Sequence, residues 1–296
     1  MSTDFKIGVA IVTYNRLGEL TQTIAAIHAQ GILLRDIFVF DNASDQPGYP
    51  ELKSNFPGLH HIRFGENRSS AGGFSEAMKE AVKNNYDWLW LFNDDSRPIR
   101  NALKTLIPFL NAPVEFSMIQ IGSVDKFGYS TKLEWRGVRK PVKIPVGDQL
   151  VSSDLVTFDG CLISVDLIKA IGPCDPEFFM GTYEFEFCLR AHDAGYKVAI
   201  LPNGLIEDKK LGSVGGLPPW REYYNTRNHL WLAISRSSFK IFRAWLWREL
   251  KFLIVILFIK DKKYERLVFK YRAVRDGFLG RRGMIYPPPF ENDQMH

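Results

Sequence analysis

Two adjacent carboxylates, Asp94 and Asp95, directly follow the apolar run WLWLF at residues 88–92. A short apolar run of this kind is typical of a buried strand. Mg²⁺ and Mn²⁺ prefer oxygen ligands and usually take one or two carboxylates together with phosphate oxygens of a substrate. Asp94 and Asp95 are therefore candidates for holding such a cation against a phosphorylated ligand.

The glycine loops that bind phosphates in other nucleotide sites are missing from the sequence. It has no GxGxxG motif after its first predicted strand and no GxxxxGK[ST] motif anywhere. A nucleotide diphosphate bound without such a loop needs another counter-charge. A divalent cation, together with an Arg or Lys, would supply it.

The first third of the chain alternates between the residue patterns of strands and helices. Strands are predicted at 5–13, 36–41, 60–64 and 87–92, and helices at 16–30 and 72–85. This alternation predicts βαβ units and a parallel sheet, in which ligands lie outside the carboxyl ends of the strands. Three predicted strands end in polar residues, namely Thr13 and Asn15, Asp41 and Asn42, and Asn93 to Ser96. These are also ordinary turn and cap residues, but their presence at three strand ends favours a ligand site.

The middle of the chain is predicted to be less regular. Residues 112–150 have the pattern of a hairpin-rich insertion. A strand is expected at 155–166, a helix at 184–195 and another strand at 196–202. From Trp220 onward the pattern is mostly helical.

The charge is distributed unevenly along the chain. The net charge is +5, but residues 236–282 carry fourteen Lys or Arg against four acids, a net of +10, and residues 1–235 carry −3. A basic tail on a mildly acidic body suggests a polyanionic partner, either nucleic acid or an anionic membrane surface. Three cysteines without metal-ligand spacing fit a reducing cytosol, and neither a secretory signal nor an apolar run of about 18 residues is seen.

Seven segments together resemble the family 2 inverting glycosyltransferases of the GT-A fold. They are VTYNR (12–16), FDNAS (40–44), ENRSSAGGF (66–74), NDDSRP (93–98), FDGCLISVDLIKAIGPCDPEFFM (158–180), EFEFCLRAHDAGYKV (184–198) and YYNTRNHLWL (223–232). The resemblance covers roughly residues 5–235 and implies an α/β fold with a mostly parallel sheet flanked by helices. Within the family, AGGF followed by the acidic motif and RP is most similar to bacterial galactofuranosyltransferases. The rhamnosyltransferases that build O-antigen and cell-wall polysaccharides are the next most similar.

The resemblance implies which positions bind the nucleotide sugar. Thr13, Asn15 and Arg16 match the loop that contacts the nucleotide and its diphosphate. Asp41, which Asn42 follows, matches the acid that accepts a hydrogen bond from the uracil or thymine imide. Arg68, Gly72 and Gly73 match the segment that closes over the ribose and diphosphate.

The resemblance also implies a metal site, with departures from the family pattern. NDDSRP matches the DXD motif, where Asn93 replaces the first acid, Asp94 lies beside the ribose and Asp95 is the metal ligand. Asp208 stands where the family usually has a His that completes the metal shell. An oxygen ligand there suits Mg²⁺ or Mn²⁺ at least as well as imidazole does.

Glu184 falls on the position of the catalytic base, with Tyr183 in place of the first acid of the usual pair. An acid near the start of a helix is alternatively a solvated residue that the helix dipole favours. Asp159 and Gly160 match the family's FDG segment and are candidates at the acceptor or donor sugar, with Asp159 as the next candidate base. Trp135, in the insertion, is a candidate platform for a sugar ring.

The implied function is transfer of galactofuranose from UDP-galactofuranose to a glycan or lipid-linked acceptor, with dTDP-rhamnose as the alternative donor. Two other classes stay open. A nucleotidyltransferase would need a glycine-rich signature loop and a Lys near the first strand, and neither is visible. A degenerate, non-catalytic family member would bind a membrane or partner enzymes.

The segment FKIFRAWLWRELKFLIVILFI at 239–259 combines aromatic, basic and apolar residues. Such stretches lie in membrane interfaces, although this one could simply pack on the catalytic domain. Its apolar content disfavours nucleic acid as the partner. We therefore expect a glycosyltransferase domain at 1–235 and a basic amphipathic tail at 236–296, placed on the cytoplasmic face of the membrane beside a polyprenyl-diphosphate-linked acceptor. Self-association or association with partner glycosyltransferases is also left open.

Overall fold

A computed structural model describes residues 5–99, 101–111, 115–123, 130–133, 141–144, 147–208, 218–258 and 261–287. One large sheet organises these residues, with the strand order β3-β2-β1-β4-β10-β6-β11-β5 and with β9 paired to β11. The first four strands are parallel neighbours: β1 (Ile7–Thr13), β2 (Ile37–Asp41), β3 (His60–Arg63) and β4 (Trp88–Asn93). The parallel sheet predicted for the first third of the chain is confirmed.

The other half of the sheet is mixed. β10 (Cys161–Ser164) runs antiparallel between β4 and β6 (Met118–Ser123). β11 (Val198–Asp208) is parallel to β6 and antiparallel to β5 (Ser96–Pro98) and β9 (Val151–Ser152). A separate antiparallel pair, β7 (Ser130–Leu133) and β8 (Pro141–Ile144), forms a small second sheet.

Two predictions for this half were incomplete. The range 112–150, predicted as a less regular, hairpin-rich insertion, contains the antiparallel pair β7–β8, but it also contains β6, which is an inner strand of the large sheet. The predicted strand at 155–166 is shorter, because β10 spans only four residues and α5 (Val165–Ile171) begins directly after it. In both places the apolar run is too short for its periodicity to define a strand.

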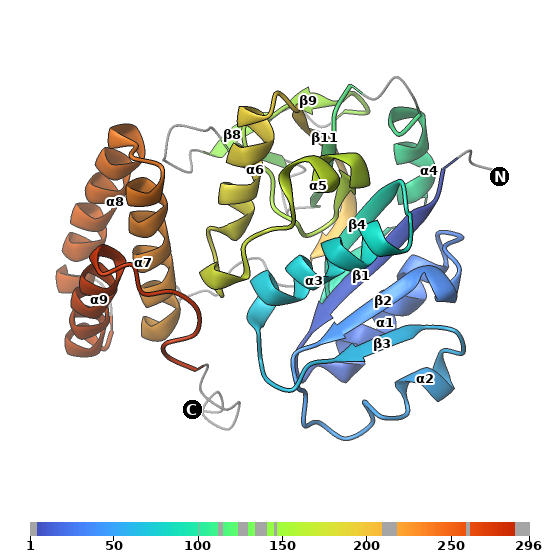
Figure 1. Ribbon diagram of the computed structural model, residues 1–296, viewed down its shortest axis with the longest axis horizontal. Coiled ribbons are helices and arrows are strands. Elements are labelled where there is room, and N and C mark those ends of the chain that lie inside the picture. The colour runs from blue at the N-terminus through green and yellow to red at the C-terminus, as the bar shows by residue number, and fades with distance from the viewer. Residues whose placement is uncertain are drawn as a thin grey trace.

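Helices cover both faces of the sheet (Figure 1). α3 (Ser69–Lys83), α5 and α6 (Tyr183–Asp193) pack on the face that carries Ala10 and Val12 of β1. α1 (Leu17–His28) and α4 (Ala102–Leu106) pack on the face that carries Val9 and Ile11, to which the short α2 (Leu52–Asn55) also contributes. Successive strand residues point to opposite faces, and since both faces are covered, β1 has no polar side chain before Thr13.

The C-terminal helices stand together at one side of the sheet (Figure 1). They are α7 (Pro219–Ser235), α8 (Phe239–Phe258) and α9 (Lys263–Phe278), as the helical pattern predicted. Trp231 and Ile241 join the apolar core of α3 and α6. Tyr223, Tyr224 and Ala273 instead form a smaller core around Phe179, a loop residue that precedes α6.

Candidate active site

The ends of β1, β2 and β4 meet at one edge of the sheet. Thr13 is the register partner of Asp41 across β1 and β2, and Val12 is the partner of Asn93 across β1 and β4. The carboxyl ends of parallel strands are the usual place for a ligand in such a sheet. The polar residues that follow these strands therefore face a common site.

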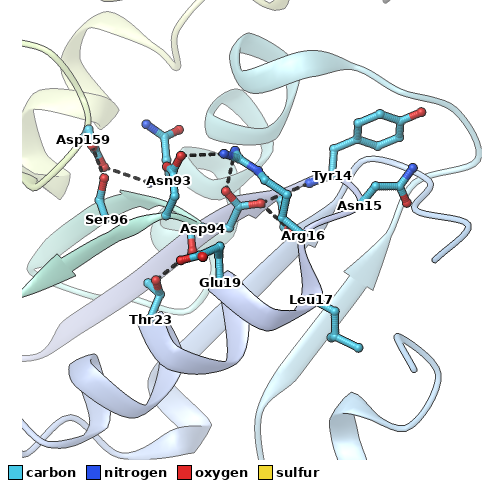
Figure 2. Close-up of polar contacts among 12 residues, drawn as sticks. Tyr14, Asn15, Arg16, Leu17, Glu19, Thr23, Asn93, Asp94, Ser96 and Asp159 are labelled. Atoms are coloured by element: carbon cyan, nitrogen blue, oxygen red, sulfur yellow. Dashed lines mark hydrogen bonds and ion pairs between the residues drawn. The ribbon is translucent and has the colours of Figure 1, made fainter. Parts of the chain in front are cut away.

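Asp94 is fully buried in the turn after β4. Its Oδ2 accepts hydrogen bonds from Thr13 Oγ1 at 2.8 Å and from the Tyr14 main-chain N–H at 3.4 Å, and its Oδ1 lies 2.5 Å from Arg16 Nη2 (Figure 2). The Thr23 hydroxyl donates to the main-chain oxygen of Asp94 at 2.8 Å. Burial raises the pKa of Asp94 to about 6, although Arg16 and Thr13 act to lower it. Both carboxylate oxygens are thus engaged by the chain itself.

Arg16 joins the two adjacent acids. Its Nη1 lies 2.5 Å from Asp95 Oδ2, while its Nη2 contacts Asp94. Burial lowers the pKa of Arg16, but the charges of Asp94 and Asp95 raise it by more. The planar fork of a guanidinium suits such a bridge. The Arg16 side chain is 32% exposed, so this cation is accessible to a ligand at the strand ends.

The predicted metal ligands are Asp95, in the turn between β4 and β5, and Asp208, at the end of the neighbouring strand β11. Asp208 ends β11, and its register partner on β5 is Ser96, the residue after Asp95. The Asp208 side chain lies outside the described part of the structure. Among the described residues, no group of three or more His, Cys, Asp or Glu could hold a metal ion. Carboxylates at these two positions nevertheless provide the hard oxygen ligands that fit Mg²⁺ or Mn²⁺.

Glu184 lies in the first turn of α6, and its Oε1 accepts a hydrogen bond from the Phe158 main-chain N–H at 2.8 Å. Asp159, the residue after Phe158, accepts hydrogen bonds from the Asn93 main-chain N–H at 2.9 Å and from the Ser96 hydroxyl (Figure 2). The two-residue segment 158–159 therefore connects the predicted base to the turn after β4.

The other predicted residues of the sugar site are Asp159, Gly160 and Trp135. Both oxygens of Asp159 accept hydrogen bonds from the turn after β4, so this residue has a structural role in holding that turn. Gly160 has φ +70°, and a Cβ there would lie 1.7 Å from the Ile206 side chain, so only glycine fits. Trp135 lies outside the described residues.

Asp41, at the end of β2, is fully buried among donors. The Ser44 main-chain N–H donates to Oδ1 at 2.9 Å, and His61 Nε2 and Arg63 Nε lie 3.2 and 3.6 Å from Oδ2. Burial acts to raise the pKa of Asp41, but hydrogen bonds from His61 and Ser44 outweigh it and the pKa is lowered. Asp41 is thus an ionised acceptor at neutral pH. Neither His61 nor Arg63 lies in a motif that predicted these contacts.

Two asparagines order the loops around this acid. Asn42 Oδ1 accepts from the Arg68 main-chain N–H at 3.0 Å, which joins the end of β2 to the start of α3. Asn15, with φ +52°, accepts at Oδ1 from the main-chain N–H groups of Asp45 and Gln46 at 2.9 and 3.2 Å. Both side chains therefore organise main chain at the site.

Gly72 and Gly73 are buried inside α3. A Cβ on Gly73 would lie 2.7 Å from a Val12 methyl, and one on Gly72 would lie 2.5 Å from the Cβ of Arg68. The close packing of α3 on β1 thus accounts for glycine at position 73. The Arg68 guanidinium lies over the Phe64 ring, 4.9 Å from its centre.

Two residues at the site carried no signal in the sequence. The Tyr49 hydroxyl is hydrogen bonded to Thr13 Oγ1 at 2.8 Å and accepts from the Arg16 main-chain N–H at 3.0 Å. Arg221, in the first turn of α7, has a pKa lowered by burial and by the positive charge of Arg16, while Asp95 acts to raise it. Tyr49 and Arg221 can be recognised as site residues only from the structure, because the fold brings their segments to the strand ends.

Relatives of known activity match the chain over much of its length. It is 23% identical over 289 residues to dTDP-rhamnosyl transferase RfbF of Shigella flexneri, covering 92% of this chain and 95% of that protein. It is 26% identical over 195 residues to galactofuranosyltransferase GlfT1 of Mycobacterium tuberculosis, covering 62% of this chain and 64% of that protein.

Solved structures share the fold. S. aureus TarS in complex with UDP-GlcNAc has a TM-score of 0.60 at 15% identity, over 93% of this chain and 81% of that chain. The mannosyltransferase PcManGT from Pyrobaculum calidifontis, in complex with GDP-Man and Mn²⁺, has a TM-score of 0.56 at 14% identity, over 96% and 77%. The predicted GT-A fold is thereby confirmed. Because residues 8–169 match Glycosyl transferase family 2, more than half of the chain carries the family pattern, and the chain belongs to glycosyltransferase family 2.

Proposed function

We propose that the chain transfers a sugar from a pyrimidine nucleoside diphosphate donor to an acceptor hydroxyl, with inversion at the anomeric carbon. The observation that best supports this is the segment 158–159, which is hydrogen bonded both to Glu184 and to the turn that carries Asp94 and Asp95. Two consecutive residues, through the Phe158 main-chain N–H and the Asp159 carboxylate, thus link the base to the diphosphate side of the site. Displacement from the face opposite the leaving group requires such a fixed geometry.

On the donor side, the ionised Asp41 accepts a hydrogen bond from the imide N–H of uracil or thymine, which replaces the contact of Arg63 with its Oδ2. Arg16 donates to the diphosphate, which offsets the charge that develops on the leaving group. Asp94, itself held by Thr13, orients Arg16 for this contact. A Mg²⁺ or Mn²⁺ ion held by Asp95 and Asp208 would add Lewis-acid stabilisation of the leaving diphosphate.

On the acceptor side, Glu184 is the general base. It takes the proton of the acceptor hydroxyl while the hydroxyl oxygen bonds to the anomeric carbon. The bond from that carbon to the diphosphate oxygen breaks, and its electron pair leaves with the nucleoside diphosphate. The transition state has oxocarbenium character, as in glycoside hydrolysis. The Phe158 N–H fixes one oxygen of the Glu184 carboxylate during this step.

UDP-galactofuranose is the first candidate donor, on the basis of the motif pattern and of the galactofuranosyltransferase relatives. dTDP-rhamnose is the second, and one observation favours it: the likeness to the rhamnosyl transferase spans 92% of the chain. Uracil and thymine present the same imide group, so Asp41 selects neither over the other. Adenine has no such N–H, but guanine has one at N1, so Asp41 disfavours adenine nucleotides only.

The acceptor is proposed to be a glycan on a polyprenyl diphosphate at the cytoplasmic face of the membrane. α8 presents a stripe of exposed apolar side chains at helical spacing: Phe239, Leu246, Trp247, Leu250, Leu253, Ile254, Leu257 and Phe258. Lys251 lies over the Trp247 ring, 5.3 Å from its centre. No helix of the described residues is long and apolar enough to cross a bilayer. An apolar stripe in a segment of net charge +10 instead fits binding to the surface of an anionic membrane.

A donor panel tests the proposal. Purified protein is incubated with membrane lipid extract, Mn²⁺ and UDP-galactofuranose, dTDP-rhamnose, UDP-GlcNAc or GDP-mannose, and transfer and donor hydrolysis are measured. The highest turnover is expected with UDP-galactofuranose, and lower turnover with UDP-GlcNAc and GDP-mannose. The highest turnover with dTDP-rhamnose would establish the second candidate. No turnover of any donor would favour a non-catalytic member of the family.

A further inference from the structure

One buried amide on α7 holds the loop that leads to Glu184. Asn228 Nδ2 lies 2.7 Å from the carbonyl oxygen of Phe178, 2.8 Å from that of Met180 and 3.2 Å from that of Gly181. The Asn228 side chain is fully buried, and its Oδ1 accepts from Arg227 Nε at 2.9 Å. An amide group has two N–H donors, and here its nitrogen lies within hydrogen-bond distance of three carbonyls of a single loop.

This loop has an unusual backbone. Phe179, Gly181 and Thr182 have φ values of +58°, +69° and +71°. Positive φ is uncommon for residues such as Phe179 and Thr182. A backbone in this conformation is stable only where the surrounding contacts fix it. Thr182 is the N-cap of α6, and Glu184 is the second residue of that helix. The backbone that Asn228 holds therefore sets the start of the helix that carries the base.

The C-terminal segment holds the same loop from a second direction. Arg227, also fully buried, donates from Nη1 to the Gly283 carbonyl at 2.8 Å, and the Gly283 N–H donates to the Glu177 carbonyl at 2.8 Å. The rings of Phe178 and Trp231 lie 4.3 Å apart between centres. The loop is thus fixed by α7 and by the chain that follows α9.

We propose that Asn228 is a positioning residue for the Glu184 carboxylate, and that α7 and the C-terminal segment belong to the catalytic unit. The inference rests on the proposed role of Glu184 as base. Without the amide, the carbonyls of the loop lose their donors, and the strained turn relaxes. The first turn of α6 then moves, and Glu184 leaves the position that the acceptor hydroxyl requires. Displacements of about 1 Å in a reacting group can lower a rate by roughly 100-fold.

The test compares Asn228→Ala with Tyr223→Phe. Tyr223 is a matched control because it is also buried on α7 and also loses one polar group, but its hydroxyl donates to Asp276 of α9 at 2.9 Å and not to the loop. For both variants the melting temperature, kcat, donor KM and UDP affinity by calorimetry are measured. Both are then combined with Glu184→Gln.

Asn228→Ala is expected to lower kcat by about 10- to 100-fold, with donor KM and UDP affinity unchanged within about twofold, while Tyr223→Phe keeps near-parental kcat. In the Glu184→Gln background, Asn228→Ala should lower kcat by less than about twofold, because residues that act as a unit are not additive. If Asn228→Ala is not obtained folded, Asn228→Ser, which keeps a small donor, makes the same comparison.

Equal kcat in Asn228→Ala and Tyr223→Phe, or a full loss added to that of Glu184→Gln, would overturn the positioning role alone. Parental turnover in Glu184→Gln itself would overturn the base assignment, and the positioning role with it.

Discussion

The strand-end site and the C-terminal helices both bury charged side chains, but they do so in opposite ways. At the strand ends, Arg16 contacts Asp94 and Asp95 while remaining 32% exposed, so a ligand can compete for the same charges. Between α7 and α9, Arg266 and Glu222 lie 2.7 Å apart and are 3% and 7% exposed, so each charge is neutralised by the other and not by a ligand. An accessible ion pair can be exchanged during a reaction cycle, whereas an enclosed one serves the structure.

The largest effect is expected from removing Asp95, which belongs to the accessible ion pair. Asp95→Ala is expected to lower transfer by at least about 100-fold, because the cation that Asp95 is proposed to hold would stabilise the charge on the leaving diphosphate, and such stabilisation is typically worth that much. The free energy of unfolding should change by less than about 1 kcal/mol, because the pair with Arg16 is partly exposed. Turnover and chemical denaturation check the two expectations.

The second proposed metal ligand, Asp208, gives a separate test of the metal assignment. Asp208→Ala should weaken the response to Mn²⁺, and Asp208→His should be tolerated, since imidazole also binds such ions. Full activity of the parent protein in a chelator would contradict the assignment.

The enclosed pair of Arg266 and Glu222 should instead affect the free energy of unfolding. Glu222→Gln removes one partner of the buried Arg266, which keeps the Asp261 carboxylate 2.8 Å away. Breaking a buried pair costs about 3–5 kcal/mol, and the remaining partner should place this variant near the lower end. Glu80→Gln is the control, because it removes the partner of the exposed Lys83 and should cost less than about 1 kcal/mol. Equal unfolding free energies of the two variants would contradict the enclosed role.

The α8 stripe gives a smaller effect. Trp247→Glu combined with Leu250→Glu should weaken binding to anionic vesicles by about tenfold or more, because it removes apolar area and adds repulsive charge. Leu33→Glu, a substitution at an exposed apolar residue outside α8, is the control. Binding of the parent should weaken as salt rises. Retained vesicle binding with loss of a dimer in light scattering would assign the stripe to self-association.

The smallest effect concerns pH. The pKa of Asp41 is lowered in the folded protein, so its stabilisation is fully present above its ordinary pKa near 3.8 and is lost as the pH falls through the lower folded value. The stability difference between the parent and Asp41→Asn should therefore be constant from about pH 5 to 7 and shrink below about pH 4. Denaturation at several pH values measures it, and a difference that grows below pH 4 would contradict the ionised acceptor.

The comparison also explains which features the sequence could predict. Asp94 and Asp95 follow a strand directly, so their place at the sheet edge depends only on local pattern and on the parallel order of the strands. The bridge from Arg16 joins residues 79 positions apart along the chain, and no local pattern specifies it. Asn228 lies in a segment that matched the family, but its partners are main-chain carbonyls, which have no sequence signature.

The role of Glu184 as the base is tested most directly by comparing the kcat of Glu184→Gln with that of Glu186→Gln. Both substitutions are neutral and nearly isosteric, and both lie in the first turn of α6, but Glu186 is paired with Arg190 at 2.7 Å and not with Phe158. A positioned general base contributes about 10²- to 10⁴-fold, so kcat of Glu184→Gln should fall by that factor with donor affinity unchanged, and kcat of Glu186→Gln should fall only slightly. Near-parental kcat in Glu184→Gln would contradict the assignment of Glu184 as the base.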